Sequence, residues 1–327
     1  YSRISARSGI EAFEMFKDLG INGMNITTPL KNDILPFADQ TDESTDRTGG
    51  VNSLLNDAGT IRGYNTDHLG VSRSLAGEDI AVKGKKCLVL GAGMSGRSAV
   101  YALQRMGGNV TIINRTFKKA HILAGNMNCN SAVFEKLQSE LSESDIFVSA
   151  LTSGTEIVKE SWLKKSLIVF DANYPRSPLS EKALSAGCKV LRGEKWLLNQ
   201  AIPSFRIFTG QDISRTETEK ISGLLGRQGQ PVSSLIIAGD KKITEDLRFL
   251  IDKNFRNMEI TTISDPYRFE TEKKSINSIK NPLILQIYSG SIDREKKLFP
   301  YSDLIIWGKD GIEDCADRTM REIDNVL

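Results

Sequence analysis

The chain contains very little histidine and cysteine, and this scarcity limits the metal chemistry that it can support. Its 327 residues include 2 histidines and 4 cysteines, and the cysteines lie far apart in the sequence. No pair of these residues has the close spacing that is typical of a zinc site. We therefore expect neither a metal site nor a disulfide framework.

An excess of one charge and long apolar runs are also missing. The 43 basic and 41 acidic side chains give a net charge of +2, which is too balanced to indicate a nucleic-acid surface. No stretch approaches the roughly 18 apolar residues of a membrane span, and no secretory signal is recognisable. We expect a cytoplasmic protein with no nucleic-acid partner and no membrane partner.

What the sequence does contain is an alternation of apolar runs and helical patterns, which predicts an α/β fold. Residues 1–84 form a small α/β unit, and because they begin with Tyr1 inside a strand that leads to a helix capped by Ser8, we expect the sequence to be a fragment. Residues 85–199 alternate more regularly and predict a doubly wound parallel sheet. The expected strands are 86–90, 109–113, 146–150 and 166–171, and the expected helices are 95–106 and 118–126.

A helical pattern at 197–223 is expected to lead the chain back to the first unit, which helices from about 200–228 would complete. The Gly, Gln and Pro residues after 226 have linker composition, so we place a domain boundary near 229. Residues 230–327 predict a third α/β domain of unknown role. Its expected strands are 234–239, 260–263, 282–288 and 303–308, and its expected helices are 245–254 and 315–326.

A glycine-rich turn follows the apolar run 86–90. Gly91, Gly93 and Gly96 match the pattern G-x-G-x-x-G, which follows a strand and opens a helix where it binds a dinucleotide. The first glycine allows a tight turn, the second lets the backbone approach a phosphate, and the third lets the helix pack on the strand. The turn, including Ala92, therefore predicts a dinucleotide site, and a purely structural turn is the alternative.

The end of the next predicted strand distinguishes between two cofactors. An acidic residue there would bind the ribose 2′-hydroxyl of NAD, but this sequence has Asn114, Arg115, Thr116 and Lys118. Basic and hydroxyl side chains suit the additional phosphate of NADP. We therefore predict NADP, and a solvated basic face without a ligand is the alternative.

Polar segments at 25–31, 51–53 and 63–67 follow strands or turns of the first unit, and they include the ammonium of Lys31 and the carboxylate of Asp67. Ligands of open α/β sheets collect at the carboxyl ends of strands, so we expect these segments to converge. A lysine beside a carboxylate can take a hydroxyl proton as hydride leaves. The pair predicts a dehydrogenase, and a surface salt bridge is the alternative.

His68 directly follows Asp67 and is a possible base. Neighbouring residues of a strand point to opposite sides, so on the expectation of a strand here we predict that His68 is not catalytic.

These motifs, in their order over about residues 1–215, resemble those of the shikimate dehydrogenase family. The matching pieces are Asn25, Thr27, Pro29 and Lys31; Val51, Asn52 and Ser53; Gly63 to Asp67; the glycine turn; Asn114 to Thr116; and Gly193 to Gln200.

The resemblance implies NADP as cofactor and Lys31 with Asp67 as the catalytic pair. It implies that Thr27, Asn52, Asn65 and Gln200 bind the substrate and that Gly193 lies near the nicotinamide. The reaction would be the reversible reduction of 3-dehydroshikimate to shikimate, a step of chorismate and aromatic amino-acid biosynthesis.

Two departures from the family leave alternatives open. The family's Ser-x-Ser turn for the substrate carboxylate is expected before Tyr1, and Trp196 stands where the family has a methionine beside the nicotinamide site. The alternatives are a quinate dehydrogenase and a non-catalytic protein that binds a metabolite or regulates. The third domain lies outside the resemblance, and we expect it to reflect fusion with other enzymes of the pathway.

Overall fold

The computed structural model of the chain describes residues 3–151, 155–174 and 177–225, together with the strands 234–238, 259–263, 282–288 and 304–307. The chain divides into two compact units. One consists of residues 22–227, and the other consists of residues 1–21 with 228–327.

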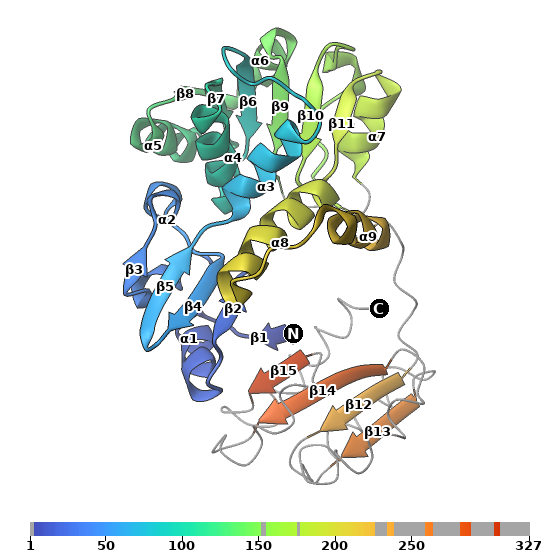
Figure 1. The fold of residues 1–327 in the computed structure, drawn as a ribbon. Coiled ribbons are helices and arrows are strands. Elements are labelled where there is room, and N and C mark those ends of the chain that lie inside the picture. Colours follow the sequence, from blue (N-terminus) through green and yellow to red (C-terminus); the bar gives the residue numbers. More distant parts are fainter. Residues whose placement is uncertain are drawn as a thin grey trace. The chain divides into compact units, whose positions relative to one another are not determined.

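The larger part of the first unit is a parallel sheet with the order β11-β10-β9-β6-β7-β8 among the described strands (Figure 1). The chain moves from the central strand β6 to one side and then returns to the other, as in a doubly wound dinucleotide-binding fold. The elements are β6 (Lys86–Leu90), α4 (Met94–Arg105), β7 (Asn109–Ile113), α5 (Phe117–Met127), β8 (Asn130–Ala132), η2 (Phe134–Lys136), α6 (Leu137–Glu143), β9 (Ile146–Ser149), η3 (Glu160–Trp162), β10 (Ile168–Asp171), α7 (Pro178–Ser185) and β11 (Lys189–Leu191).

Both faces of this sheet are buried, which explains why its strands read as continuous apolar runs. Val89 and Val148 belong to the core on one face, and Leu88 and Phe147 belong to the core on the other. Cys87 lies in the first of these cores, where burial raises the pKa of its thiol to about 12. The predicted strands 86–90 and 109–113 are confirmed, as are the helices that follow each of them.

The smaller part of the first unit is a mixed sheet with the order β2-β4-β5-β3. Strands β4 and β5 form an antiparallel hairpin, and Ala58 and Gly59 at its turn have φ values of 50° and 94°. Such positive values are typical of two-residue hairpin turns. The elements are β2 (Gly23–Asn25), η1 (Leu35–Phe37), β3 (Gln40–Thr41), α2 (Glu43–Thr48), β4 (Ser53–Asp57) and β5 (Thr60–Tyr64).

Two helices connect the two sheets of this unit. α3 (Asp67–Ala76) leads into the parallel sheet, and α8 (Gly193–Thr209) returns and packs along α3 (Figure 1). The helical pattern at 197–223 corresponds to two helices: α8 ends at Thr209 before Gly210, whose φ is 69°, and a separate helix, α9 (Arg215–Leu225), follows. Ser214 caps α9, because its hydroxyl accepts from the Glu217 amide at 3.2 Å.

The second unit contains a parallel sheet with the order β1-β15-β14-β12-β13 among its described strands. Its elements are β1 (Arg3–Ser5), α1 (Gly9–Asp18), β12 (Ser234–Ala238), β13 (Glu259–Ile263), β14 (Pro282–Tyr288) and β15 (Leu304–Trp307). The Ser8 hydroxyl caps α1, as predicted. The predicted helices 245–254 and 315–326 lie outside the described residues, and the predicted domain boundaries stay a prediction.

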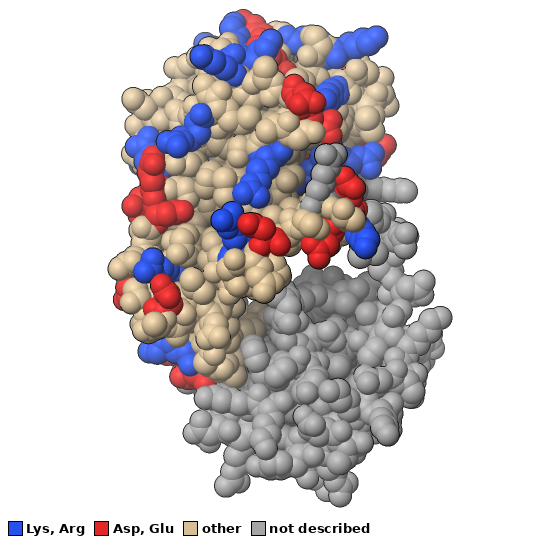
Figure 2. Space-filling view, in the orientation of Figure 1, with Lys and Arg blue, Asp and Glu red and all other residues tan. Residues whose placement is uncertain are grey.

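The surface agrees with the balanced composition. On the face of the described residues that Figure 2 shows, basic and acidic side chains are interspersed rather than gathered into one patch of one sign. In the part of the chain that the structure describes, no helix combines the length and the apolar character that crossing a membrane requires.

Candidate active site

Lys31 and Asp67 form a buried ion pair. Lys31 lies in the turn after β2, and Asp67 is the first residue of α3, where the helix dipole favours a carboxylate. The Lys31 Nζ donates to Asp67 Oδ2 at 2.5 Å, and the two residues are 7% and 2% exposed. The alternative of a surface salt bridge is therefore wrong.

Asn52 holds the second oxygen of the Asp67 carboxylate. Its Nδ2 donates to Asp67 Oδ1 and to Thr66 Oγ1, both at 2.9 Å, while its Oδ1 accepts from the Thr66 amide at 2.9 Å. These bonds fasten the start of α3 to the segment before β4. Both oxygens of the carboxylate are thus held by side chains from the part of the unit that contains the mixed sheet.

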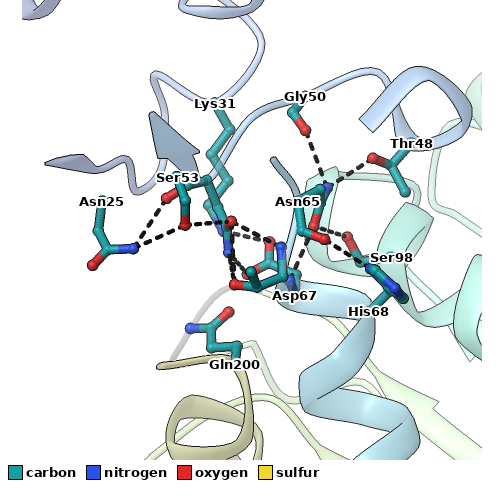
Figure 3. Close-up of polar contacts among 12 residues, drawn as sticks. Asn25, Lys31, Thr48, Gly50, Ser53, Asn65, Asp67, His68, Ser98 and Gln200 are labelled. Atoms are coloured by element: carbon teal, nitrogen blue, oxygen red, sulfur yellow. Dashed lines mark hydrogen bonds and ion pairs between the residues drawn. The ribbon is translucent and has the colours of Figure 1, made fainter. Parts of the chain in front are cut away.

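Asn65 joins four neighbouring segments around the pair (Figure 3). Its Nδ2 donates to Thr48 Oγ1 at 2.7 Å and to the Gly50 carbonyl at 3.1 Å. Its Oδ1 accepts from the Asp67 amide at 3.0 Å and from the Ser98 hydroxyl of α4 at 3.4 Å. The amide of Asn65 is engaged in positioning Asp67, and its predicted role as a substrate ligand stays a prediction.

Gln200 brings a further polar group to the pair from α8. Figure 3 shows its amide projecting from the helix toward Lys31 and Asp67. Its Oε1 is buried and has no hydrogen-bond partner within the described part of the chain. A buried acceptor without a partner is costly and is typical of a site that a ligand completes. Thr27, the other predicted substrate ligand outside this cluster, is exposed in the turn that leads to Lys31.

Three buried hydroxyls fasten α8 beneath this site. The Ser204 Oγ lies 2.8 Å from Ser53 Oγ and 3.0 Å from Thr66 Oγ1. These contacts join α8 to Ser53 of β4 and to Thr66 just before α3, while completion of the unit 1–84 by helices from about 200–228 stays a prediction. They also fix the helix that carries Gln200.

The glycine turn has the geometry of a phosphate-binding turn. Gly91 has a φ of 112°, and Gly96 lies so close to it that a Cβ at position 96 would come 1.9 Å from the Gly91 carbonyl oxygen. A Cβ at Gly93 would meet open space, and Gly93 is the N-cap of α4. The turn therefore leaves the N-terminal amides of α4 accessible to a phosphate.

The basic residues after β7 lie beside this turn. The Asn114 Oδ1 accepts from the Ala92 amide at 3.2 Å, and its Nδ2 donates to the Thr116 carbonyl at 3.1 Å. Arg115 and Lys118 are exposed next to it, at the start of α5. Two cations, a helix N-terminus and a glycine cradle fit a phosphate-bearing dinucleotide.

Gly193 stands where α8 begins, against the carboxyl end of β10. A Cβ at this position would come 2.3 Å from the Ala172 carbonyl oxygen, so glycine allows the helix to approach the strand. Trp196, one turn later, is 5% exposed, and its Nε1 donates to the Asp67 carbonyl at 3.0 Å.

His68 lies on a helix and not on the strand that the sequence analysis expected at this position. Asp67 and His68 lie on α3 and not on a strand, because the strand β5 ends at Tyr64. Its Nδ1 lies 2.7 Å from the Asn65 carbonyl, and its ring meets the Tyr101 ring edge-on with centroids 5.1 Å apart. His68 projects from α3 against Tyr101 of α4, and in the described part of the chain it makes no hydrogen bond with Lys31.

Burial of His68 predicts a pH dependence of stability. Desolvation lowers the pKa of His68 below its usual value of 6.5, so the unfolded chain takes up this proton at a higher pH than the folded chain does. The contribution of this group to stability is full above that usual value and declines as pH falls through the folded pKa. His68→Gln is expected to flatten the fall in melting temperature from about pH 7.5 to about pH 5. The exposed His121→Gln is the control, and equal slopes in wild type and His68→Gln would contradict this assignment.

Several of these contacts were not predicted from the sequence. The end of α2 at Thr48 with the following Gly50, the hydroxyl of Ser98 and the indole of Trp196 each support the pair from distant parts of the chain. Local spacing contains no signal for such partners. Among the described residues, no group of His, Cys, Asp and Glu could hold a metal ion.

Two family models match the chain. The model described as shikimate dehydrogenase substrate binding domain matches residues 3–54, and the model described as shikimate / quinate 5-dehydrogenase matches residues 74–184.

Relatives with known names cover the same region. The NADP⁺ shikimate dehydrogenase of Aquifex aeolicus is 34% identical over 215 residues, which are 64% of this chain and 79% of that protein. The corresponding protein of Haloarcula marismortui is 35% identical over 214 residues, 63% of this chain and 80% of that protein.

Solved structures agree with this similarity. The Aquifex aeolicus shikimate dehydrogenase structure has a TM-score of 0.61 at 33% identity and covers 64% of this chain and 80% of its own. The Thermus thermophilus enzyme in complex with NADP(H) and shikimate has a TM-score of 0.58 at 28% identity, covering 65% and 83%. The quinate dehydrogenase of Corynebacterium glutamicum in complex with NAD has a TM-score of 0.60 at 28% identity, covering 65% and 81%.

A Rossmann-type sheet with its glycine turn, joined to a small α/β part that holds a buried lysine–carboxylate pair, defines a dinucleotide-dependent oxidoreductase. The named relatives narrow this class of oxidoreductases to one family. The chain belongs to the shikimate dehydrogenase family. The predicted family, the fold class and the NADP-dependent enzyme class are confirmed.

Proposed function

We propose that the chain catalyses the reversible reduction of 3-dehydroshikimate to shikimate by NADPH, in the cytoplasm, as a step of chorismate and aromatic amino-acid biosynthesis. The observation that carries this proposal is the buried contact of 2.5 Å between Lys31 Nζ and Asp67 Oδ2. An ion pair that only stabilises the fold does not require a buried acceptor without a partner beside it. Gln200 Oε1 is such an acceptor. The arrangement suits a site at which a hydroxyl group is bound and deprotonated.

Lys31 would move the proton at the reacting oxygen. In the direction of oxidation the substrate O–H gives its proton to the Lys31–Asp67 pair while its carbon loses hydride, and in reduction the ammonium returns a proton to the carbonyl oxygen. When bound, NADP(H) exchanges that hydride with the substrate carbon. Asp67 would orient the ammonium, and Asn52 would keep the carboxylate in place through its contact of 2.9 Å.

Thr27 and Gln200 are the residues we assign to the other substrate hydroxyls. Thr27 is exposed four residues before Lys31 in the same turn, and the amide of Gln200 projects toward the pair from α8 (Figure 3). Asn52 and Asn65 already use their amides to position Asp67, so direct contact of either with substrate remains a prediction.

The residues at the glycine turn fit NADP. Gly91, Gly93 and Gly96 would hold the pyrophosphate at the start of α4, and Asn114, Arg115, Thr116 and Lys118 would hold the additional phosphate. We also assign Gly193 to the nicotinamide end, since it lies at the carboxyl edge of the same sheet as the turn.

The direct test is the assay of NADP⁺ reduction with shikimate, using the chain with any residues that precede Tyr1 in the natural protein. We expect the appearance of NADPH absorbance that depends on both substrates. Binding of shikimate without turnover, seen as a rise in melting temperature only, would instead support a metabolite-binding or regulatory protein.

Arg115→Ala tests the assignment of the cofactor phosphate. Loss of a charge-assisted contact is expected to raise KM for NADP⁺ by about 10-fold to 100-fold, with little change for NAD⁺. Lys136→Ala, an exposed lysine on η2, is the matched control. An equal effect of Arg115→Ala on both cofactors would contradict a contact with the additional phosphate.

A quinate dehydrogenase is the second candidate, because one family model covers both activities and the Corynebacterium glutamicum quinate dehydrogenase shares the fold. The values of kcat/KM for shikimate and quinate, measured side by side, distinguish the two. If kcat/KM is higher for quinate than for shikimate, quinate takes the place of shikimate as the substrate in the proposal. The fusion of residues 230–327 to other pathway enzymes remains a prediction.

A further inference from the structure

Trp196 carries a buried polar group that the proposed mechanism does not use. It lies on α8, is 5% exposed, and donates from its Nε1 to the backbone carbonyl of Asp67 at 3.0 Å. A buried indole N–H normally requires an acceptor, but here the acceptor belongs to the residue that pairs with Lys31. The contact joins positions that are 129 residues apart in the sequence.

The indole also determines how closely α3 and α8 approach. A Cβ at Gly70 would come 2.4 Å from Trp196 Cδ1 and 2.7 Å from the Trp196 carbonyl oxygen. Gly70 follows Asp67 by three residues on α3, so the two residues lie on the same face of this helix. Glycine at this position allows the two helices to meet with the indole between them.

The indole ring of Trp196 also packs against the parallel sheet that carries the glycine turn. Its ring centroid lies 5.3 Å from that of Phe170 in β10, with the planes inclined at 53°. Phe170 is fully buried in the core of the parallel sheet. Gly193, one turn before Trp196 on α8, contacts the backbone just after the same strand. Trp196 therefore touches both the start of α3 and the strand next to the proposed nicotinamide end.

We propose that Trp196 is a positioning residue for the proton-transfer group: its indole N–H holds the Asp67 carbonyl while its ring fixes α3 against β10. The carboxylate of Asp67 is thereby kept at a constant place relative to the carboxyl edge of the cofactor sheet. This role rests on the proposed function. A displacement of about 1 Å in a catalytic group can lower a rate by about 100-fold, so a fixed backbone at Asp67 has a direct effect on turnover.

Trp196→Phe removes the donor and retains an aromatic ring. We expect kcat for shikimate oxidation to fall by about 10-fold, which corresponds to the loss of roughly one buried hydrogen bond, while KM for shikimate and NADP⁺ stays within about twofold. Trp196→Met, which fills the space without a donor, is the second variant and is expected to lose kcat in the same way. Trp162→Phe, which removes an indole from η3, is the matched control and is expected to keep wild-type kcat.

A double-mutant cycle separates positioning from a general effect on the fold. If Trp196 acts through Asp67, Trp196→Phe costs about 10-fold in the wild-type background and less than about twofold when Asp67→Asn is already present. If the role of Trp196 is purely structural, Trp196→Phe lowers kcat by the same factor in both backgrounds. Equal losses, or a wild-type kcat in Trp196→Phe, would overturn the assignment.

Hydrogen exchange of the indole N–H gives a readout without turnover. The Trp196 Nε1 proton, assigned by its loss in Trp196→Phe, is expected to exchange more slowly than that of Trp162. Exchange as fast as that of Trp162 would also overturn the proposal. A wild-type chain without shikimate-dependent turnover contradicts the proposed function and is recognised before any variant is compared, whereas turnover that Trp196→Phe leaves unchanged contradicts only the role of Trp196.

Discussion

Replacing Lys31 by alanine is expected to lower kcat for shikimate oxidation by about 100-fold to 10,000-fold, the usual contribution of a positioned acid or base. KM should change much less, because Thr27 and Gln200 remain to bind the other hydroxyls. The physical reason is the burial of the pair: with Lys31 7% exposed, water has little access to replace the ammonium next to Asp67. Initial rates over a range of substrate concentrations measure both constants.

Loss of Lys31 also leaves the Asp67 carboxylate without its cation. Breaking a buried ion pair commonly destabilises a protein by about 3–5 kcal/mol. We expect a smaller loss of about 1–3 kcal/mol, since Asn52 still donates to Asp67 and the carboxylate lies at a helix N-terminus. Urea unfolding measures this change. Lys165→Ala, an exposed lysine, is the control, and a Lys31→Ala variant with wild-type kcat would contradict the catalytic role.

Asp67→Asn is expected to lower kcat by a similar factor with a smaller loss of stability. The amide has nearly the same shape as the carboxylate, but it neither carries the charge that orients the Lys31 ammonium nor shares its proton. Because the two residues act as a unit, the double variant Lys31→Ala with Asp67→Asn should be little worse than the more damaging single variant. Single and double variants are compared by kcat under one set of conditions.

Additive losses would contradict the account of Lys31 and Asp67 as one proton-handling unit. In that case each residue would contribute separately, and the contact of 2.5 Å between them would be structural. Ser72→Ala offers a matched control on α3, because the Ser72 hydroxyl donates to the Leu69 carbonyl of its own helix and not to the pair or its partners. Its effect on kcat should be small and additive with either substitution.

The part of the fold that contains the parallel sheet could be predicted closely, because the sequence signals for its strands and its glycine turn are local. Parallel strands buried on both faces are continuous apolar runs, and β6 and β7 have the predicted bounds. The glycine turn was also predictable, since the positive φ of Gly91 and the crowding at Gly96 each require glycine within a few residues. The helical pattern at 197–223 did not show where α8 ends and α9 begins, because apolar residues occur on both sides of Gly210.

The candidate site was predicted as a set of residues but not as a geometry. The motifs indicated that Lys31 and Asp67 belong together, and the structure brings them into contact across 36 residues. The placement of Asp67 at the start of a helix was missed, and with it the reason for the orientation of His68. The support from Trp196 depends on the packing of α8 on α3, which no local spacing encodes.

The most direct measurement is a crystal structure of the chain with NADP⁺ and shikimate bound, determined on the Asp67→Asn variant if turnover must be slowed. The account predicts that the reacting hydroxyl lies within about 2.6–3.2 Å of Lys31 Nζ, with the nicotinamide on the opposite side of the substrate carbon next to Gly193. A substrate whose reacting hydroxyl lies away from Lys31, or a nicotinamide far from the carboxyl edge of the parallel sheet, would contradict it.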